Sequence, residues 1–310
     1  PRQWSGERYS AGGVITMTDQ IPIKAIKTGS TATALGEFAA GDQIPADYLQ
    51  AALDQSAFKN LLINGDFAIN QEGFAGGALS AGVYGYDQWK AGTGGCNVTL
   101  SGDVLTHTSG PLVQVIEAPR LAGKTVSVSV EDPSGSVTVN VDGVTGTITA
   151  GSGRRAVSVA VPSGSTGNVT LTITATGVTY KRVQLEVGAA ATAWEQRPVA
   201  IEMTLCLRHF FALSGVGGSL FAFSGFATST TTLLIVAAFP EAMRITPACT
   251  TDGLIAAQTP VGATTTITLT GTALGKSGGN VSFSGSSFTS GVPLCLRLNA
   301  GVSIKFDARF

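Results

Sequence analysis

The sequence predicts a mostly β protein with two β domains separated by one short helix. Glycine accounts for 40 of the 310 residues, and serine and threonine crowd the same stretches. Runs in which apolar and polar residues alternate recur between glycine, proline and aspartate turns, which is the pattern of antiparallel strands. With 44% apolar residues there is material for two cores, and a chain of this length suggests about two domains.

Residues 1–58 are predicted to form an extended arm that carries one short helix. Residues 1–16 show no periodicity, and Thr, Gly and Ser dominate the stretch that follows. Pro45 suits the first turn of a helix, and Leu49 and Leu53 share one of its faces. A helix of about three turns is too short to be stable alone in water. It is therefore expected to contact copies of itself or another protein.

A jelly-roll β-sandwich is predicted for residues 59–195. Val, Leu or Ile alternates with polar residues in four runs, which are centred on Val128, Val139, Val159 and Leu171. Each run ends at Gly, Pro or Asp, as hairpins of an antiparallel sandwich require. The alternation changes phase between Tyr180 and Val183, which predicts a β-bulge at that point.

Residues 196–212 are predicted to be a connector helix with one buried face. The helix would begin after Pro198, and its apolar stripe would contain Val199, Met203, Cys206 and Phe210. Residues 213–310 return to strand patterns and are predicted to form a C-terminal β-sandwich domain. The last strand alternates perfectly, and its inward side chains would be Val302, Ile304, Phe306, Ala308 and Phe310.

Composition excludes several classes of function. A net charge of −1 and a pI near 6.2 leave no broad electrostatic surface for nucleic acid. No apolar run approaches the ~20 residues of a membrane-spanning helix, so membrane insertion is not expected. The cysteines are widely separated, so three disulfide pairings remain open beside the simpler interpretation that all four are small buried side chains: Cys96, Cys206, Cys249 and Cys295.

No catalytic motif is present, and we expect that the protein is not an enzyme. Its two histidines, His107 and His209, stand in no recognisable nucleophile or zinc motif. The glycine-rich stretches lack the Gly-Lys-Ser/Thr ending of a phosphate-binding loop. No cofactor and no metal is predicted. A structural calcium ion near Asp66 and Glu72 is the alternative left open, because calcium needs six to eight oxygen ligands and sequence does not show convergence.

Four motifs in order resemble a module of bacteriophage virion fibre proteins. They are "NLLINGDF" from Asn60, "QLEVG" from Gln184, "WEQRP" from Trp194 with a following helix and paired aromatics, and "FPEAMRITP" from Phe239. The stretch "KAIKTGSTATALGEFAAGDQIPADYL" from Lys24 is similar to the ends that attach such fibres to the particle. The resemblance implies a carbohydrate-binding-module-like jelly roll, a C-terminal β domain and a homotrimer located on the virion.

The resemblance also implies non-catalytic binding of a host surface structure, with a glycan as the expected ligand, and attachment to other phage structural proteins through residues 1–58. Aromatic rings are the side chains best suited to sugars, so Tyr84, Tyr86 and Phe288 are the predicted ligand-binding residues, on the expectation that their rings are exposed. Trp89 is interpreted as a core residue. The competing hypothesis is an architectural collar, baseplate or head-decoration fibre that contacts only other virion proteins.

Overall fold

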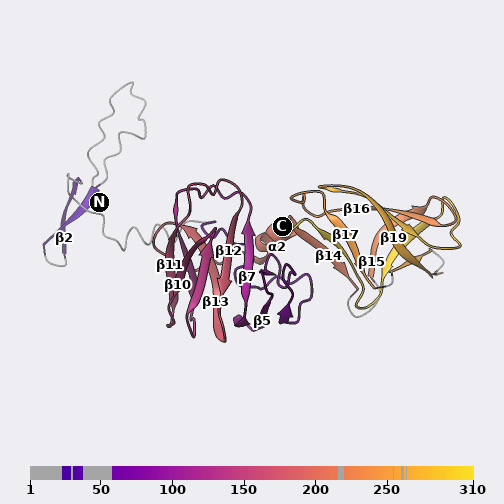
Figure 1. Ribbon diagram of the computed structural model, residues 1–310. Helices are drawn as coiled ribbons and strands as arrows, with labels where there is room; N and C mark the ends of the chain where they lie inside the picture. The colour runs from indigo at the N-terminus through magenta and orange to yellow at the C-terminus, as the bar shows by residue number, and fades with distance from the viewer. Residues whose placement is uncertain are drawn as a thin grey trace, which may run out of the picture. The chain divides into compact units, whose positions relative to one another are not determined.

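The computed structural model describes residues 23–28, 31–37, 58–215, 220–253, 255–259, 262 and 264–310. The mostly β prediction is confirmed: the described chain consists of strands and one helix, α2 (Figure 1). The chain separates into two compact units, 1–55 and 56–310. The predicted arm over 1–16 and the predicted helix over 45–58 lie outside the described residues, apart from Phe58.

In the first unit, β1 (Ile23–Thr28) and β2 (Thr31–Glu37) form an antiparallel hairpin. Its register pairs Ile23 with Glu37, and the pairing shifts between Ile26 and Lys27. A two-stranded hairpin on its own is marginally stable at best in water.

Two antiparallel sheets make up the predicted jelly-roll-like sandwich (Figure 1). The five-stranded sheet has the order β10-β9-β12-β7-β4, and the six-stranded sheet has the order β11-β8-β13-β6-β5-β3. The first sheet contains β4 (Lys90–Ala91), β7 (Pro111–Ile116), β9 (Val137–Val141), β10 (Val144–Ile148) and β12 (Val169–Thr174). The second contains β3 (Gly77–Leu79), β5 (Cys96–Ser101), β6 (Val104–Ser109), β8 (Thr125–Glu131), β11 (Arg154–Ala160) and β13 (Val178–Val187).

The alternating pattern of the strands fills one core between the two sheets. Val128, Val139 and Leu171 are fully buried in one cluster with Trp89, as the sequence predicts. Burying a side chain of this kind contributes roughly 1.5–3 kcal/mol. The predicted bulge is confirmed, because the pairing of β13 with β8 shifts register between Lys181 and Gln184.

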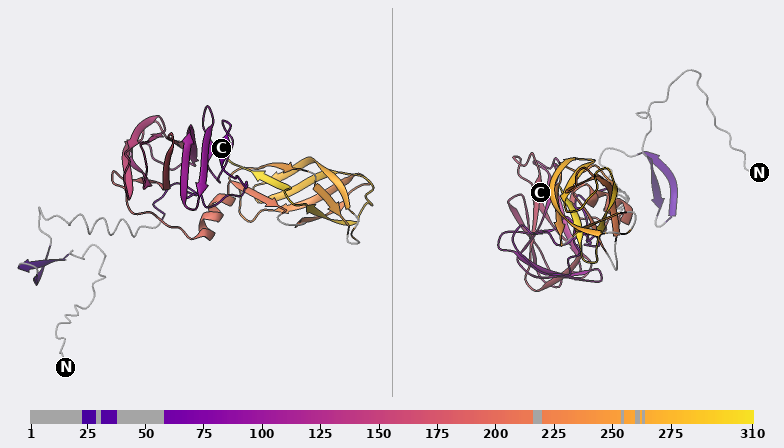
Figure 2. Two further views of the ribbon diagram at one scale, coloured as in Figure 1. Left: turned by 90° about the horizontal axis from the view of Figure 1, so that it is seen from below. Right: turned by 90° about the vertical axis from the view of Figure 1, so that its right-hand side faces the viewer.

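Helix α2 (Val199–Leu207) confirms the predicted connector helix (Figure 2). It follows Pro198, whose fixed backbone angle suits a helix start. The predicted buried stripe is wrong in three places, and one of them is Met203, which is only half-buried. Val199 is 66% exposed, and Phe210 belongs to a strand instead of the helix. Of the helical residues only Cys206 is buried.

The C-terminal domain closes into a barrel in place of the two open sheets of the predicted sandwich. The strand order is β15-β16-β20-β19-β18-β21, with β21 pairing back to β15. Its members are β15 (Leu220–Ala227), β16 (Thr232–Ala238), β18 (Ile255–Gln258), β19 (Thr264–Gly275), β20 (Gly278–Ser284) and β21 (Pro293–Leu298).

Strand β19 contributes to the curvature of the barrel wall. It is 12 residues long, and its first part pairs with β18 whereas its second part pairs with β20. The register shifts between Leu269 and Gly271, and such a bulge bends a strand. One bent strand thus joins both halves of the wall. A three-stranded sheet of order β14-β22-β17 adjoins the barrel, and it contains β14 (Phe210–Ser214), β17 (Ala248–Asp252) and β22 (Ser303–Asp307).

Candidate functional site

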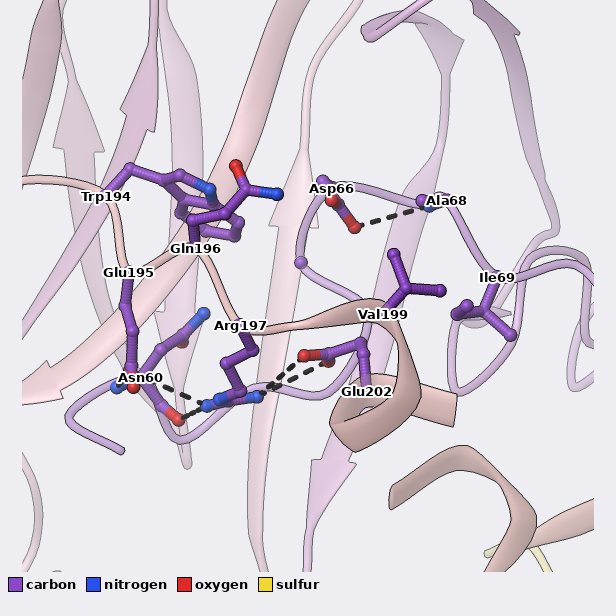
Figure 3. Close-up of a pocket in the computed structure, with 11 residues that line it drawn as sticks. Asn60, Asp66, Ala68, Ile69, Trp194, Glu195, Gln196, Arg197, Val199 and Glu202 are labelled. Atoms are coloured by element: carbon purple, nitrogen blue, oxygen red, sulfur yellow. Dashed lines mark hydrogen bonds and ion pairs between the residues drawn. The ribbon is translucent and has the colours of Figure 1, made fainter. Parts of the chain in front are cut away.

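Residues of the motifs at the start and at the end of the sandwich segment of the sequence line one small polar cavity (Figure 3). The cavity has a volume of about 20 Å³, which is room for roughly one water molecule. Its lining includes Asn60, Asp66, Trp194, Glu195, Arg197 and Glu202. Residues separated by more than 130 positions in the sequence are therefore neighbours here.

Arg197 is the centre of this arrangement, and its side chain is only 7% exposed. It donates a hydrogen bond of 2.9 Å to the carbonyl of Leu62 and another to the carbonyl of Asn60. It also forms ion pairs with Glu195 at 3.8 Å and with Glu202 at 3.2 Å. In Figure 3 its guanidinium lies between Asn60 and Glu202.

The two carboxylates complete the contact with the start of the sandwich. Glu195 accepts hydrogen bonds from the backbone N–H groups of Asn60, at 2.6 Å, and of Phe58. Glu202, one turn into α2, accepts from the N–H of Asn64. We call the set Asn60, Glu195, Arg197 and Glu202 the clasp. It joins the entry of the chain into the sandwich to its exit.

The strand before the clasp explains why the chain returns to this place. Gln184 and Glu186 point away from the core, yet both are buried under the segment that follows β13. Glu186 accepts from the Thr192 N–H at 2.8 Å and from its hydroxyl at 2.7 Å. Gln184 accepts from the N–H of Glu195 at 2.9 Å. The "QLEVG" motif thus fixes the path of the "WEQRP" corner.

The Asn64-Gly65 turn likewise fixes the path of the chain, at the point where it enters the sandwich. Asn64 has a φ of 56°, a conformation that asparagine tolerates better than most residues. Its side chain bonds the backbone of Ile69 and Asp87, and its carbonyl accepts from the Trp89 indole N–H at 2.8 Å. A Cβ atom on Gly65 would lie 2.3 Å from a backbone oxygen, so this position requires glycine.

Two of the three predicted ligand-binding residues are in cores, which corrects the expectation that they are exposed. Tyr86 is 4% exposed, packs against Phe67 and Phe74, and accepts a hydrogen bond from the Leu100 N–H. Phe288 is 7% exposed and belongs to the barrel core. These two rings are buried because each lies next to an apolar cluster, and burying an aromatic ring removes about 150–250 Å² of its surface from water.

Tyr84, the third predicted residue, lies at the junction between the sandwich and the C-terminal strands. Its hydroxyl donates to the carbonyl of Phe310 at 2.9 Å and accepts from the N–H of the same residue at 3.1 Å. The Arg309 guanidinium lies 4.0 Å from the centre of its ring. Burial raises the pKa of the Tyr84 hydroxyl.

Glu72 is the acid that joins the two sides of this junction. It pairs with Lys305 at 2.6 Å and with Arg309 at 2.7 Å. Arg309 is 5% exposed in its side chain and is stacked between the rings of Tyr84 and Phe210. Burial alone would lower the pKa of Arg309, but the partners Asp307 and Glu72 outweigh it and raise the pKa. We call Glu72, Tyr84, Phe210, Lys305 and Arg309 the junction.

These contacts also bear on the alternative of a calcium ion near Asp66 and Glu72. The Glu72 carboxylate is already engaged by two cations, and Asp66 bonds the N–H of Ala68. Within the described residues, no group of three or more His, Cys, Asp or Glu side chains could hold a metal ion.

All four cysteines are free thiols; Cys96 and Cys206 are buried, and the other two are half-buried. No helix in the described part of the chain is long and apolar enough to cross a membrane.

His209 is 3% exposed, and its Nδ1 has no hydrogen-bond partner. Burial lowers its pKa to about 4, and the nearby Arg208 and Arg244 act in the same direction against Glu117. The unfolded chain, with a histidine pKa of about 6.5, therefore binds this proton first as pH falls. Stability contributed by neutral His209 is complete above pH 6.5 and is lost between pH 6.5 and 4.

We expect His209→Gln to weaken the loss of stability at low pH. Between pH 7 and 4.5, the free energy of unfolding of the wild type should fall by about 2 kcal/mol more than that of the variant. Urea unfolding at the two pH values measures the difference. Burial raises the pKa of Asp87, but that contribution is common to both proteins and cancels. Equal pH dependence would contradict the assignment.

Two accessible surfaces among the described residues could contact a ligand such as a glycan. The first is on the barrel wall, where Phe226 is 45% exposed beside its cross-strand neighbours Leu234 and Pro293. Asn280 and Ser282 lie on the same wall, and the only charged residue in the six barrel strands is Arg297. The second is a hollow of about 440 Å³ on the five-stranded sheet, lined by Lys90, Thr93, Pro111, Val113, Thr170 and Thr172.

Comparisons with known proteins add little to this geometry. No family model matches the sequence, and no curated protein matches it. Among solved structures, wild-type discoidin II from Dictyostelium discoideum aligns with 78% of this chain and 92% of its own. The sequence identity is 10% and the TM-score is 0.20. A TM-score this low does not establish a shared fold.

Proposed function

We propose that this chain is a bacteriophage virion fibre protein that binds a host surface glycan without catalysis. Residues 1–58 attach it to other structural proteins of the particle, and copies associate as a homotrimer. The observation that carries the proposal is the clasp. The "NLLINGDF" and "WEQRP" motifs, on which the resemblance to phage fibres rests, contact each other through Asn60, Glu195 and Arg197, as parts of one recurrent module must.

The hairpin of β1 and β2 supports the proposed attachment. Both of its outer edges lack a partner strand among the described residues. Strand edges offer backbone N–H and C=O groups to a strand or sheet of another protein. An isolated hairpin gains stability from such pairing, so a partner on the particle would stabilise the hairpin.

Phe226 is the proposed sugar contact. An exposed aromatic face can pack on the apolar face of a pyranose ring, while amide and hydroxyl groups such as those of Asn280 and Ser282 bond the sugar hydroxyls. The low charge of the wall favours a neutral glycan over an acidic one. A shallow contact suffices, since association of several copies raises avidity by about 10²–10⁴ without any new contact.

Binding of the fluorescently labelled full chain to bacteria tests the proposal. We expect binding to susceptible cells and loss of binding to cells that lack the surface glycan. Phe226→Ala should reduce cell binding at least tenfold, because the loss at each site is repeated in every copy. Val83→Ala is the matched control, since Val83 is 46% exposed on the sandwich. If the wild type binds neither strain, the glycan-binding function is wrong.

The architectural function remains the second candidate, and one observation favours it. Helix α2 exposes apolar side chains, including Val199 and Ile201, and such surfaces mark contacts between proteins. A fibre that only contacts other virion proteins would need these surfaces and would not need Phe226. The cell-binding experiment separates the two functions.

A further inference from the structure

The single charged residue of α2 points into the protein, and several apolar residues point out. Glu202 has only 13% of its side chain exposed, because it contacts Arg197 (Figure 3) and also accepts a hydrogen bond from the Asn64 N–H. Val199 is 66% exposed and Ile201 is 40% exposed. A surface helix of a soluble protein normally has the opposite arrangement, with its apolar stripe buried and its charges in water.

An apolar hollow of about 320 Å³ lies beside this helix. Leu205 of α2 and Arg208, the residue that follows the helix, line one side of it, and residues 61–63 and 115–117 line much of the rest. Phe58 also lines the hollow, and its side chain is 64% exposed. The hollow is large enough for the side chain of an isoleucine or a phenylalanine.

The charges at this surface cancel. Arg208 pairs with Glu117 at 2.9 Å, and the exposed residues of the helix, Val199, Ala200, Ile201 and Thr204, carry no charge. An anionic membrane would require unpaired basic residues, which this surface does not offer. A surface depleted of charge with exposed aromatic and aliphatic side chains is typical of the centre of a protein–protein interface.

The same chain presents both the projecting side chains and the hollow, and this favours a second copy as the partner. In a closed ring, the projecting group of each copy enters the hollow of its neighbour. A net charge of −1 gives little repulsion between copies. We propose that the surface formed by Phe58, Ile201 and the hollow, the α2 surface, is the interface between copies of this chain. The inference rests on the proposed self-association and assigns it a location.

Sedimentation velocity of the full chain over a range of concentrations tests the location. We expect Ile201→Lys and Phe58→Lys each to weaken self-association about a hundredfold, as for a charge placed at the centre of an apolar interface. Both side chains are exposed in the single chain, so circular dichroism should be unchanged. Val236→Lys, at a residue 58% exposed on the barrel wall, is the matched control and should associate like the wild type.

The outcomes separate the two levels of the proposal. If the wild type and both α2 variants associate equally, copies meet elsewhere and the α2 surface is not the interface. If the wild type is monomeric at every concentration, self-association itself is wrong. If Ile201→Lys lost its helical signal, Phe58→Lys would still decide, because Phe58 contacts Glu195 through its backbone N–H and not through its ring.

Discussion

Arg197→Ala is expected to lower the free energy of unfolding by about 3–5 kcal/mol, since removing one partner of a buried ion pair leaves the others uncompensated. Glu195 and Glu202, whose side chains are 11% and 13% exposed, would lose their cation. The carbonyls of Asn60 and Leu62 would lose a donor. A loss of this size corresponds to roughly 10 °C in melting temperature for a unit of about 250 residues.

Arg208→Ala is the matched control for the clasp. Arg208 also pairs with a glutamate, Glu117, but the two side chains are 45% and 36% exposed. Exposed pairs contribute about 0–1 kcal/mol, so the control should melt within about 3 °C of the wild type. Thermal unfolding followed by circular dichroism measures both proteins. If the two variants melted at the same temperature, the clasp would not be a stabilising element.

Arg309→Ala is expected to separate the unfolding of the sandwich from that of the C-terminal strands. The change removes the ion pair with Glu72 and the stacking on Tyr84 and Phe210. Together these contribute about 2–4 kcal/mol. Two structures held together by such contacts melt as one; without them each melts at its own temperature. Differential scanning calorimetry should show one transition for the wild type and two for the variant.

The control for the junction is Arg182→Ala. Arg182 also forms a network with two acids, Glu131 and Asp103, but it lies within the sandwich and its side chain is 34% exposed. Its removal should leave a single transition that shifts by only a few degrees. A single transition in Arg309→Ala as well would mean that other contacts couple the sandwich and the C-terminal strands.

The fold was predictable where apolar residues alternate along a strand and all face the same core. Alternation located the strands around Val128 and Leu171, and the phase change after Tyr180 located a real bulge. Barrel closure was not predictable, because it depends on the pairing of β15 with β21 and of β16 with β20. These strands are far apart in the sequence, and no local pattern specifies their pairing.

The candidate sites were less predictable than the strands. The motif sequences identified the clasp residues but not their roles, since hydrogen bonds across 135 or more positions leave no local signal. Aromatic residues were chosen by type, yet Tyr86 is in the core and Phe226 is exposed. Strand parity would have helped with Phe226, because it shares its side of β15 with the exposed Ser224 and not with the buried Ala227.

The clasp has a mechanical consequence for a protein that is pulled along its length. The chain enters the sandwich at Phe58 and leaves it at Arg197, and the clasp bonds these two places to each other. Tension applied between residues before Phe58 and the barrel therefore passes directly through the clasp into α2. The eleven strands between them carry almost none of that load. The sandwich, which the junction also bonds to the C-terminal strands, is expected to extend only after Arg197 has released its partners.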